Sequence, residues 1–243
     1  QTIANCTSGD ARFQSSTGAI TVALNWYPNG LQLPLYAARA NGCYEKRGLS
    51  VELEPFKGSR RATEAVLSGE ATVGIVGAAT VTRSRSGGEP LVPVATLFQR
   101  PMVVLFTTRE RFGERLVTVD QLRGHRVGMP TASETSLLGR VFLAQAGVLD
   151  DVDIVEIDGE ETAALKSDQV DVVTGVFADP LRLESAGVTV DSIHVADRYP
   201  VYGPTLVTSD ATLEQQQEEI EAIIAGTTEG WIAATRDPGA VAE

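Results

Sequence analysis

The sequence predicts an α/β protein with two lobes, and three observations lead to this prediction. From residue 19 onward, apolar runs of strand length alternate with amphipathic stretches, which is typical of a largely parallel sheet covered by helices. The alternation occurs twice, over residues 19–98 and again over residues 99–202. A long amphipathic stretch at residues 213–234 then has no place in the second set, so we expect the chain to return to the first lobe.

In the first set, residues 20–24 form an apolar strand, and a helix over residues 34–41 begins with a proline, which the first helical turn tolerates. Residues 49–55 alternate as the second strand, and Ser59 can cap the next helix. The remaining elements expected in this set are a helix at residues 60–67, a strand at 72–76, a helix at 78–86 that ends at Gly87-Gly88, and a strand at 91–98.

The second set repeats the pattern. Its expected strands are residues 102–107, 126–129, 154–157, 170–176 and 193–195, and its expected helices are residues 133–146, 160–167 and a helix after Asp179-Pro180. A strand at residues 205–208 precedes the last helix. We therefore predict a polar tail at residues 1–18, a first lobe of residues 19–98 and 203–243, and a second lobe of residues 99–202. Two crossover segments would leave a ligand cleft between the lobes.

Composition restricts the classes of partner. The 243 residues are 43% hydrophobic, which is enough apolar material for a core and excludes intrinsic disorder. The net charge of -12 would repel phosphate backbones, so we expect no nucleic-acid partner. No apolar run reaches the roughly 18 residues of a membrane-spanning helix. Because the chain begins at Gln1, we expect a processed, exported product.

Catalytic and cofactor motifs are missing from the sequence. It has no Gly-x-Ser-x-Gly elbow, and its two histidines, His125 and His194, lie at the edges of predicted strands, as ordinary surface histidines do. Neither a phosphate loop nor a dinucleotide-binding glycine motif is present. We therefore predict no catalytic residue, no cofactor and no metal.

The two cysteines allow two interpretations, a disulfide or a lipid anchor. Cys6 and Cys43 can close one disulfide in an exported protein, and two cysteines without supporting histidines make a poor metal site. Alternatively, residues 3–6 resemble a weak lipobox, in which Cys6 would carry a lipid anchor at the outer face of the cytoplasmic membrane.

Three loops place small or polar residues after predicted strands, where open α/β sheets bind ligands. Residues 25–29 carry Trp26, which can stack on a planar ring or can simply pack in its loop. Residues 77–80 have small side chains before a helix whose free N–H groups favour an acceptor atom. Residues 130–135 form a hydroxyl-rich helix start, for which ordinary capping is the alternative explanation.

The order of several motifs resembles a known family. Leu-Asn-Trp-Tyr-Pro-Asn at residues 24–29, Leu-Tyr-Ala-Ala at 35–38 and Gly-Cys-Tyr-Glu-Lys-Arg-Gly-Leu at 42–49 follow one another as in the solute-binding proteins of ABC importers related to the yeast thiamine-pyrimidine synthase. Weaker similarities lie at residues 67–71, 88–92, 120–124 and 170–175. The resemblance implies a type II periplasmic-binding-protein fold whose two α/β lobes close on a small ligand.

The resemblance also implies partners and a ligand. An importer permease and its ATPase would be the partners of a monomeric, extracytoplasmic binding protein. The synthase branch has a histidine where this chain has Gln32, and a cysteine-rich motif that is missing here, so we expect no enzyme activity. A thiamine-precursor-like pyrimidine is the favoured ligand; sulfonates, nitrate-like anions, riboflavin and other aromatic solutes are alternatives, and a pyrimidine-synthase-like enzyme is a further one.

In this hypothesis Trp26 stacks on the ring, Tyr199 or Tyr202 closes the other side, and Asp179 accepts from an exocyclic amine unless it only caps its helix. Amides, hydroxyls and helix N–H groups would supply the remaining hydrogen bonds. The complete set of predicted ligand-binding residues is Trp26, Asn29, Gln32, Ala78, Thr80, Gln99, Thr131, Ser133, Glu134, Asp179, Tyr199 and Tyr202.

Overall fold

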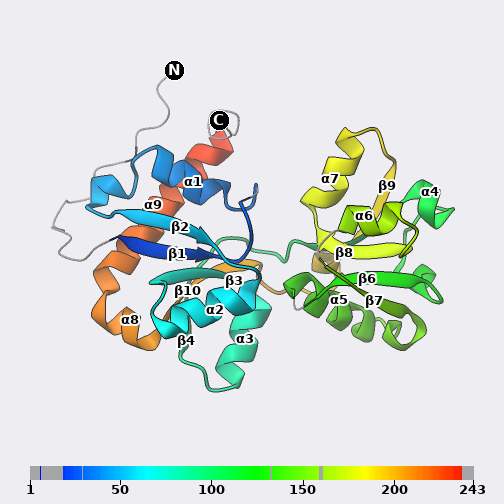
Figure 1. Ribbon diagram of the computed structural model, residues 1–243, viewed down its shortest axis with the longest axis horizontal. Helices are drawn as coiled ribbons and strands as arrows, with labels where there is room; N and C mark the ends of the chain where they lie inside the picture. Colours follow the sequence, from blue (N-terminus) through cyan, green and yellow to red (C-terminus); the bar gives the residue numbers. More distant parts are fainter. Residues whose placement is uncertain (1–5, 7–18, 29, 132, 159–160, 237–243) are drawn as a thin grey trace. The chain divides into compact units, whose positions relative to one another are not determined.

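The computed structural model describes residues 6, 19–28, 30–131, 133–158 and 161–236 (Figure 1). These residues form two compact units. Unit 1 contains the described residues up to Val76, residues Thr80–Leu97, and those from Thr205 onward; unit 2 contains Gly77–Ala79 and Phe98–Pro204. Asn29, one of the predicted ligand-binding residues, lies outside the described residues. The lobe boundaries and the ligand cleft stay predictions.

Unit 1 is built on a five-stranded sheet with strand order β2-β1-β3-β10-β4 (Figure 1). Strand β1 is parallel to both β2 and β3, whereas β10 is antiparallel to β4. The strands are β1 (Ile20–Leu24), β2 (Val51–Pro55), β3 (Val73–Gly77), β4 (Leu91–Thr96) and β10 (Pro204–Ser209). The helices are α1 (Leu33–Ala40), the 3-10 helix η1 (Glu45–Arg47), α2 (Ser59–Ser68), α3 (Ala78–Ser86), α8 (Asp210–Gln215) and α9 (Gln217–Arg236).

Alternating side chains on the strands of unit 1 supply two cores. Val22 and Leu24 of β1 belong to a core shared with α1 and α9, while Ala23 belongs to a second core shared with α2. This is the result expected when successive strand residues point to opposite faces of a sheet. The helices therefore cover both faces of the sheet and leave its strand ends free to carry loops.

Helix α9 packs closely on α1 because Gly230 and Ala38 carry no bulky side chain that would separate the two helices. Gly230 lies against α1: a Cβ placed there would be 2.1 Å from the Pro34 carbonyl oxygen and 2.6 Å from the Ala38 Cβ. Thr227 lies one helical turn before Gly230 on α9, and its hydroxyl forms a 2.9 Å hydrogen bond with the hydroxyl of Tyr44, which is fully buried. Burial raises the pKa of Tyr44 to about 12.

Unit 2 has a second five-stranded sheet, with strand order β7-β6-β8-β5-β9. Strand β6 is parallel to β7 and β8, while β5 is antiparallel to β8 and β9. The strands are β5 (Val103–Thr108), β6 (Arg126–Pro130), β7 (Asp153–Ile157), β8 (Val172–Val176) and β9 (Val190–His194). The helices are α4 (Arg109–Phe112), α5 (Glu134–Gln145), α6 (Glu161–Lys166) and α7 (Ala178–Ser185), with 3-10 helices η2 (Val119–Leu122), η3 (Leu149–Asp151) and η4 (Val195–Asp197).

The two faces of this sheet also have separate cores. Residues of α5, including Phe142, pack with Val103 and Leu105 of β5, whereas α6 and α7 pack with Val104 and Phe106 on the other face. Both sheets thus follow the layered α/β arrangement that the sequence predicts.

Several predicted elements differ from the observed ones in their bounds; β2 begins at Val51 rather than at residue 49, and β4 ends at Thr96 rather than at residue 98. Three further differences have a local cause. The expected helix over residues 213–234 is two helices, because Ser209 caps α8 through a 3.1 Å bond from the Thr212 N–H and Gln216 leaves the helical conformation. The last strand of the second set begins at Val190 rather than at residue 193, since Val190 pairs with Thr108 of β5. Strand β8 begins at Val172 rather than at residue 170, and the preceding Asp171 binds arginines.

No helix among the described residues has the length and hydrophobicity needed to cross a membrane.

Candidate solute-binding edges

In unit 1, the carboxyl ends of β1, β2 and β3 lie at the same edge of the sheet because these strands are parallel. Two backbone hydrogen bonds join the loops that follow β1 and β2. The Phe56 N–H donates to the Leu24 carbonyl at 2.8 Å, and the Gly58 N–H donates to the Asn25 carbonyl at 2.9 Å. Gly58 has a φ of 92°, which other residues rarely adopt, and it immediately precedes α2. The β1 loop is therefore held against the β2 loop.

Trp26 and Tyr27 occupy this fixed loop. Their ring centroids are 6.0 Å apart and the ring planes meet at 73°, an edge-to-face arrangement. Trp26 is half-buried, while 61% of Tyr27 is exposed. The loop thus presents two aromatic rings of different orientation at the carboxyl edge, which suits contact with a planar solute.

The other predicted residues near this edge are less accessible. Gln32 is only 3% exposed and directly precedes α1, where its carbonyl oxygen accepts from the Leu35 N–H at 2.9 Å. Thr80 is 4% exposed in the first turn of α3, and Ala78, partly buried, begins that helix. Side chains as buried as those of Gln32 and Thr80 could reach a solute only from within the wall of a pocket, whereas Trp26 is only partly buried.

In unit 2, the carboxyl ends of β6, β7 and β8 again share an edge. Thr131 follows β6 and is exposed; its N–H donates to the Ile157 carbonyl at 3.0 Å, which ties the ends of β6 and β7 together. Ser133 caps α5, accepting from the Ser136 N–H at 3.0 Å and forming a 2.8 Å hydrogen bond with the Thr135 hydroxyl. Glu134, partly buried, is the first residue of α5. Ser133 is therefore the N-cap of α5, and contact with a solute stays a prediction.

Asp179 lies in the first turn of α7, after β8. Its carboxylate accepts from the Val176 N–H at 2.8 Å and from Arg182 at 2.9 Å. Burial raises the pKa of Asp179, although the hydrogen bond from Val176 and the charge of Arg182 oppose the shift. Both carboxylate oxygens thus have partners within the unit, an arrangement that favours a local structural role.

Three further predicted residues flank the two crossover segments. These segments pair with each other, because the Gly203 N–H donates to the Phe98 carbonyl at 2.9 Å and the Phe98 N–H donates to the Pro204 carbonyl at 3.3 Å. Gln99 is exposed beside this pairing. Tyr199 packs partly buried against the unit 2 core, while 57% of Tyr202 is exposed.

Sequence reasoning did not select Phe56 and Phe177. Each aromatic residue directly follows a strand, β2 and β8 respectively, at the carboxyl edge of its sheet. An aromatic residue directly after a strand is the sequence signal that points to both positions.

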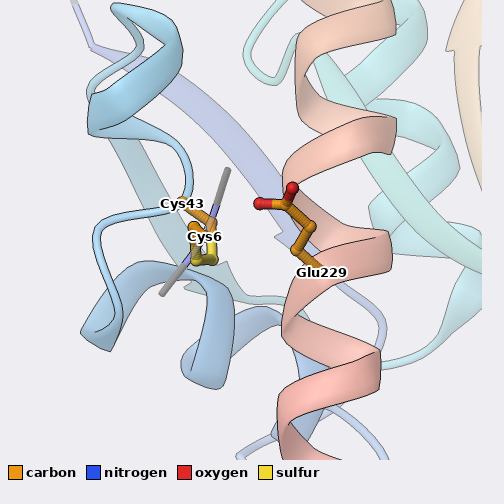
Figure 2. A group of neighbouring side chains, drawn as sticks. All are labelled: Cys6, Cys43 and Glu229. Atoms are coloured by element: carbon orange, nitrogen blue, oxygen red, sulfur yellow. A yellow bond between two sulfur atoms is a disulfide. The ribbon is translucent and has the colours of Figure 1, made fainter. Parts of the chain in front are cut away.

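Cys6 and Cys43 form a disulfide in unit 1, with their Cα atoms 5.2 Å apart (Figure 2). Glu229 of α9 points toward them, and its carboxylate and the two sulfurs lie within 4.8 Å of one another. The bonded sulfurs are not thiolates, however, and Glu229 pairs with Arg47 at 3.0 Å, so this state is unsuited to metal binding. The disulfide and a lipid at Cys6 are alternatives, because one sulfur cannot form both bonds.

The fold defines a class of protein. The periplasmic aliphatic sulphonate-binding protein SsuA from Escherichia coli superposes with a TM-score of 0.76 at 18% identity, covering 93% of this chain and 77% of SsuA. An ancestral arginine-binding protein superposes with a TM-score of 0.64 at 16% identity, covering 90% of this chain and 98% of that protein. The chain therefore has the fold of periplasmic binding proteins, which confirms the predicted fold class.

The sequence comparisons then identify the family. Residues 29–241 match NMT1/THI5-like proteins, and the chain belongs to this family, which confirms the resemblance drawn from its motifs.

Two relatives match most of the chain. The riboflavin-binding protein RibY of Chloroflexus aurantiacus is 28% identical over 223 residues, covering 89% of this chain. The formylaminopyrimidine-binding protein of Halalkalibacterium halodurans is 24% identical over 236 residues, covering 94% of this chain and 70% of its own length. The chain spans 62% of the length of RibY.

A pyrimidine phosphate synthase of Saccharomyces cerevisiae, THI11, is 30% identical over 115 residues, covering only 46% of this chain and 33% of the synthase. The two relatives that match over most of the chain are thus named as binding proteins, and this synthase matches over less than half of it.

Proposed function

We propose that this protein is the extracytoplasmic solute-binding component of an ABC importer, and that its solute is a small, planar, nitrogen-containing molecule. Membership of the NMT1/THI5-like family and the periplasmic-binding-protein fold support the general role. An importer permease and its ATPase would be its partners.

The observation that carries the solute class is the aromatic loop after β1. Trp26 and Tyr27 place two rings at the carboxyl edge of the unit 1 sheet, on a loop fixed by backbone hydrogen bonds to its neighbour. Stacking on such a ring favours a planar solute, and the amide and hydroxyl groups predicted to bind it would favour one with ring nitrogens or an exocyclic amine. A thiamine-precursor-like pyrimidine meets both conditions.

Riboflavin is the second candidate solute. The relative named for riboflavin binding is 28% identical over 89% of this chain, and a flavin is also a planar, nitrogen-rich ring system. An isoalloxazine ring presents a larger face than a pyrimidine, so a flavin stacked on Trp26 would also reach Tyr27, whose ring plane lies at 73° to that of Trp26 and would contact the flavin edge-on. Single substitutions of the two rings therefore separate the candidates.

Binding is better supported than catalysis. General acid-base chemistry needs a titratable group within reach of the substrate, and the predicted site offers chiefly Glu134 and Asp179. The Asp179 carboxylate is already engaged by Val176 and Arg182. Turnover of a pyrimidine by the purified protein would contradict the proposal.

The decisive experiment is a thermal-shift screen against pyrimidines, flavins, sulfonates and nitrate, followed by isothermal titration calorimetry of each hit. We expect one-to-one binding of a pyrimidine or a flavin without product formation. Stabilisation by sulfonates or nitrate alone would contradict the stacked-ring proposal while leaving the importer role intact.

The test of the aromatic loop compares Trp26→Ala with Trp26→Phe. Loss of the ring should weaken binding about tenfold or more, while phenylalanine keeps a stacking face and should restore most of the affinity. Trp231→Ala on α9 is the matched control, since it removes an indole from a helix that is not at the edge. Equal affinity of Trp26→Ala and the unsubstituted protein would overturn the assignment.

A further inference from the structure

Unit 2 contains a groove that the predicted solute site does not explain. Its volume is about 540 Å³, and small-molecule sites commonly occupy roughly 300–1,000 Å³. The lining comes from three parts of unit 2: the segment before β5, the region from Phe177 through α7, and the end of β9 with η4. Of the predicted ligand-binding residues, Gln99 lies on this groove.

Regular structure holds these three parts together. Near the start of β5, Val103 pairs with Val176 of β8 and Val104 pairs with His194 of β9. The Phe177 N–H also donates to the Met102 carbonyl at 2.9 Å, and α7 packs on β9. The walls of the groove are therefore fixed by the sheet, as a preformed site requires.

The inner surface of the groove is largely apolar. Met102 and Pro180 are buried in its lining, while Phe177 and Leu181 also line it and are 37% and 54% exposed. Large apolar side chains that stay exposed inside a concavity are surfaces that a ligand with an apolar body would cover.

Charged side chains of both signs line the same groove. Arg100 comes from the segment before β5, Glu184 from α7 and Asp197 from η4, and all three are exposed. Within the described part of the chain, none of the three side chains forms an ion pair or a hydrogen bond. Opposite charges are thus held apart in one concavity, where each is available to a ligand.

We propose that this groove is a second binding site, and that it takes a zwitterion of the amino-acid type with an aromatic or branched apolar side chain. The ligand carboxylate would pair with Arg100, its ammonium group with Glu184, and its apolar body would cover Phe177 and Leu181. A ligand with one charge alone would leave the opposite group of the protein unpaired, so both charges contribute to recognition.

Three probes with the same ring test this charge pattern on the full chain: L-phenylalanine, 2-phenylethylamine and 3-phenylpropanoate. Isothermal titration calorimetry should show L-phenylalanine binding about tenfold more tightly than either single-charge analogue. Saturation with the pyrimidine or flavin found in the solute screen should leave phenylalanine binding unchanged, because all lining residues of the groove except Gln99 lie outside the predicted solute site.

Single substitutions then assign each charge. Arg100→Gln should weaken phenylalanine and phenylpropanoate about tenfold and leave phenylethylamine unchanged, while Glu184→Gln should weaken phenylalanine and phenylethylamine and leave phenylpropanoate unchanged. The matched controls are Arg83→Gln and Glu214→Gln, the same charge changes at exposed positions of unit 1. Phe177→Ala should weaken all three probes.

Three results would overturn the proposal: no binding of phenylalanine at millimolar concentration, equal affinity for the three probes, or the same affinity in Arg100→Gln and Glu184→Gln as in the two control variants. Competition between phenylalanine and the principal solute would also overturn it as a second site.

Discussion

At the scale of single residues, Asp171 is the most heavily engaged carboxylate of unit 2. It accepts from Arg111 at 2.7 Å, and from the side chain and the backbone N–H of Arg126 at 2.8 Å and 2.9 Å. Burial by itself would raise its pKa, but these hydrogen bonds hold the pKa of Asp171 well below its ordinary value. The cluster fixes the beginning of β6 against the beginning of β8.

Asp171→Asn should lower the free energy of unfolding by about 2–3 kcal/mol at pH 7, because it removes the charge that Arg111 and Arg126 share. A lowered pKa gives stability that is fully present above the unfolded value near 4 and is lost as pH falls toward the folded pKa. The difference between the variant and the unsubstituted protein should therefore shrink below about pH 4.

Urea unfolding at pH 7 and pH 3 measures this difference. Asp210→Asn is the control: Asp210 pairs with Arg85 at 3.4 Å with both side chains about half exposed, so its loss should cost under about 0.5 kcal/mol. A pH-independent effect of Asp171→Asn would contradict the charge argument.

At the scale of elements, the close packing of α9 on α1 makes Gly230 a critical position. Gly230→Ala should lower the free energy of unfolding by about 1–3 kcal/mol, although alanine favours helix by about 1 kcal/mol, because the added methyl meets the α1 backbone. Gly30→Ala is the matched control, since nothing lies within 4 Å of a Cβ there. Chemical denaturation compares the two variants, and equal stability would contradict the packing argument.

The disulfide is a second source of stability at this scale, because it links Cys6 covalently to the segment between α1 and η1. Because the cysteines are separated by 37 in sequence, loss of the disulfide should lower the free energy of unfolding by about 3–4 kcal/mol through the added freedom of the unfolded chain. Denaturation of the Cys6→Ser/Cys43→Ser variant measures the loss. Intact mass should rise by about 2 Da on reduction, and an unchanged mass would show that the bond is absent.

At the scale of the whole molecule, the two units have separate sheets and separate cores. Domains of this kind can unfold as separate cooperative units. Differential scanning calorimetry should show two overlapping transitions, with Gly230→Ala lowering one and Asp171→Asn lowering the other. A single transition that both variants shift equally would mean that the units unfold together.

Local pattern was enough to locate most strands and helices. The Val-Gly-Ile-Val-Gly run of β3 is wholly buried, and the position of Trp26 after β1 follows from the strand that precedes it. Such features could be predicted from the sequence because the spacing of the apolar residues within a strand or helix determines which of its faces is buried.

The tertiary structure alone decided contacts between distant residues. The hydrogen bond from Tyr44 to Thr227 joins positions 183 residues apart, and the need for glycine at position 230 arises only when α1 lies against it. The accessibility of the candidate site was likewise decided by the tertiary structure: Gln32 is buried and Asp179 is engaged by Val176 and Arg182, while Trp26 is only partly buried. The sequence determined the class, the family and the aromatic loop, because these depend on neighbouring residues. Which polar groups stay available to a ligand depends on packing between elements. The spacing of residues within one element does not determine that packing.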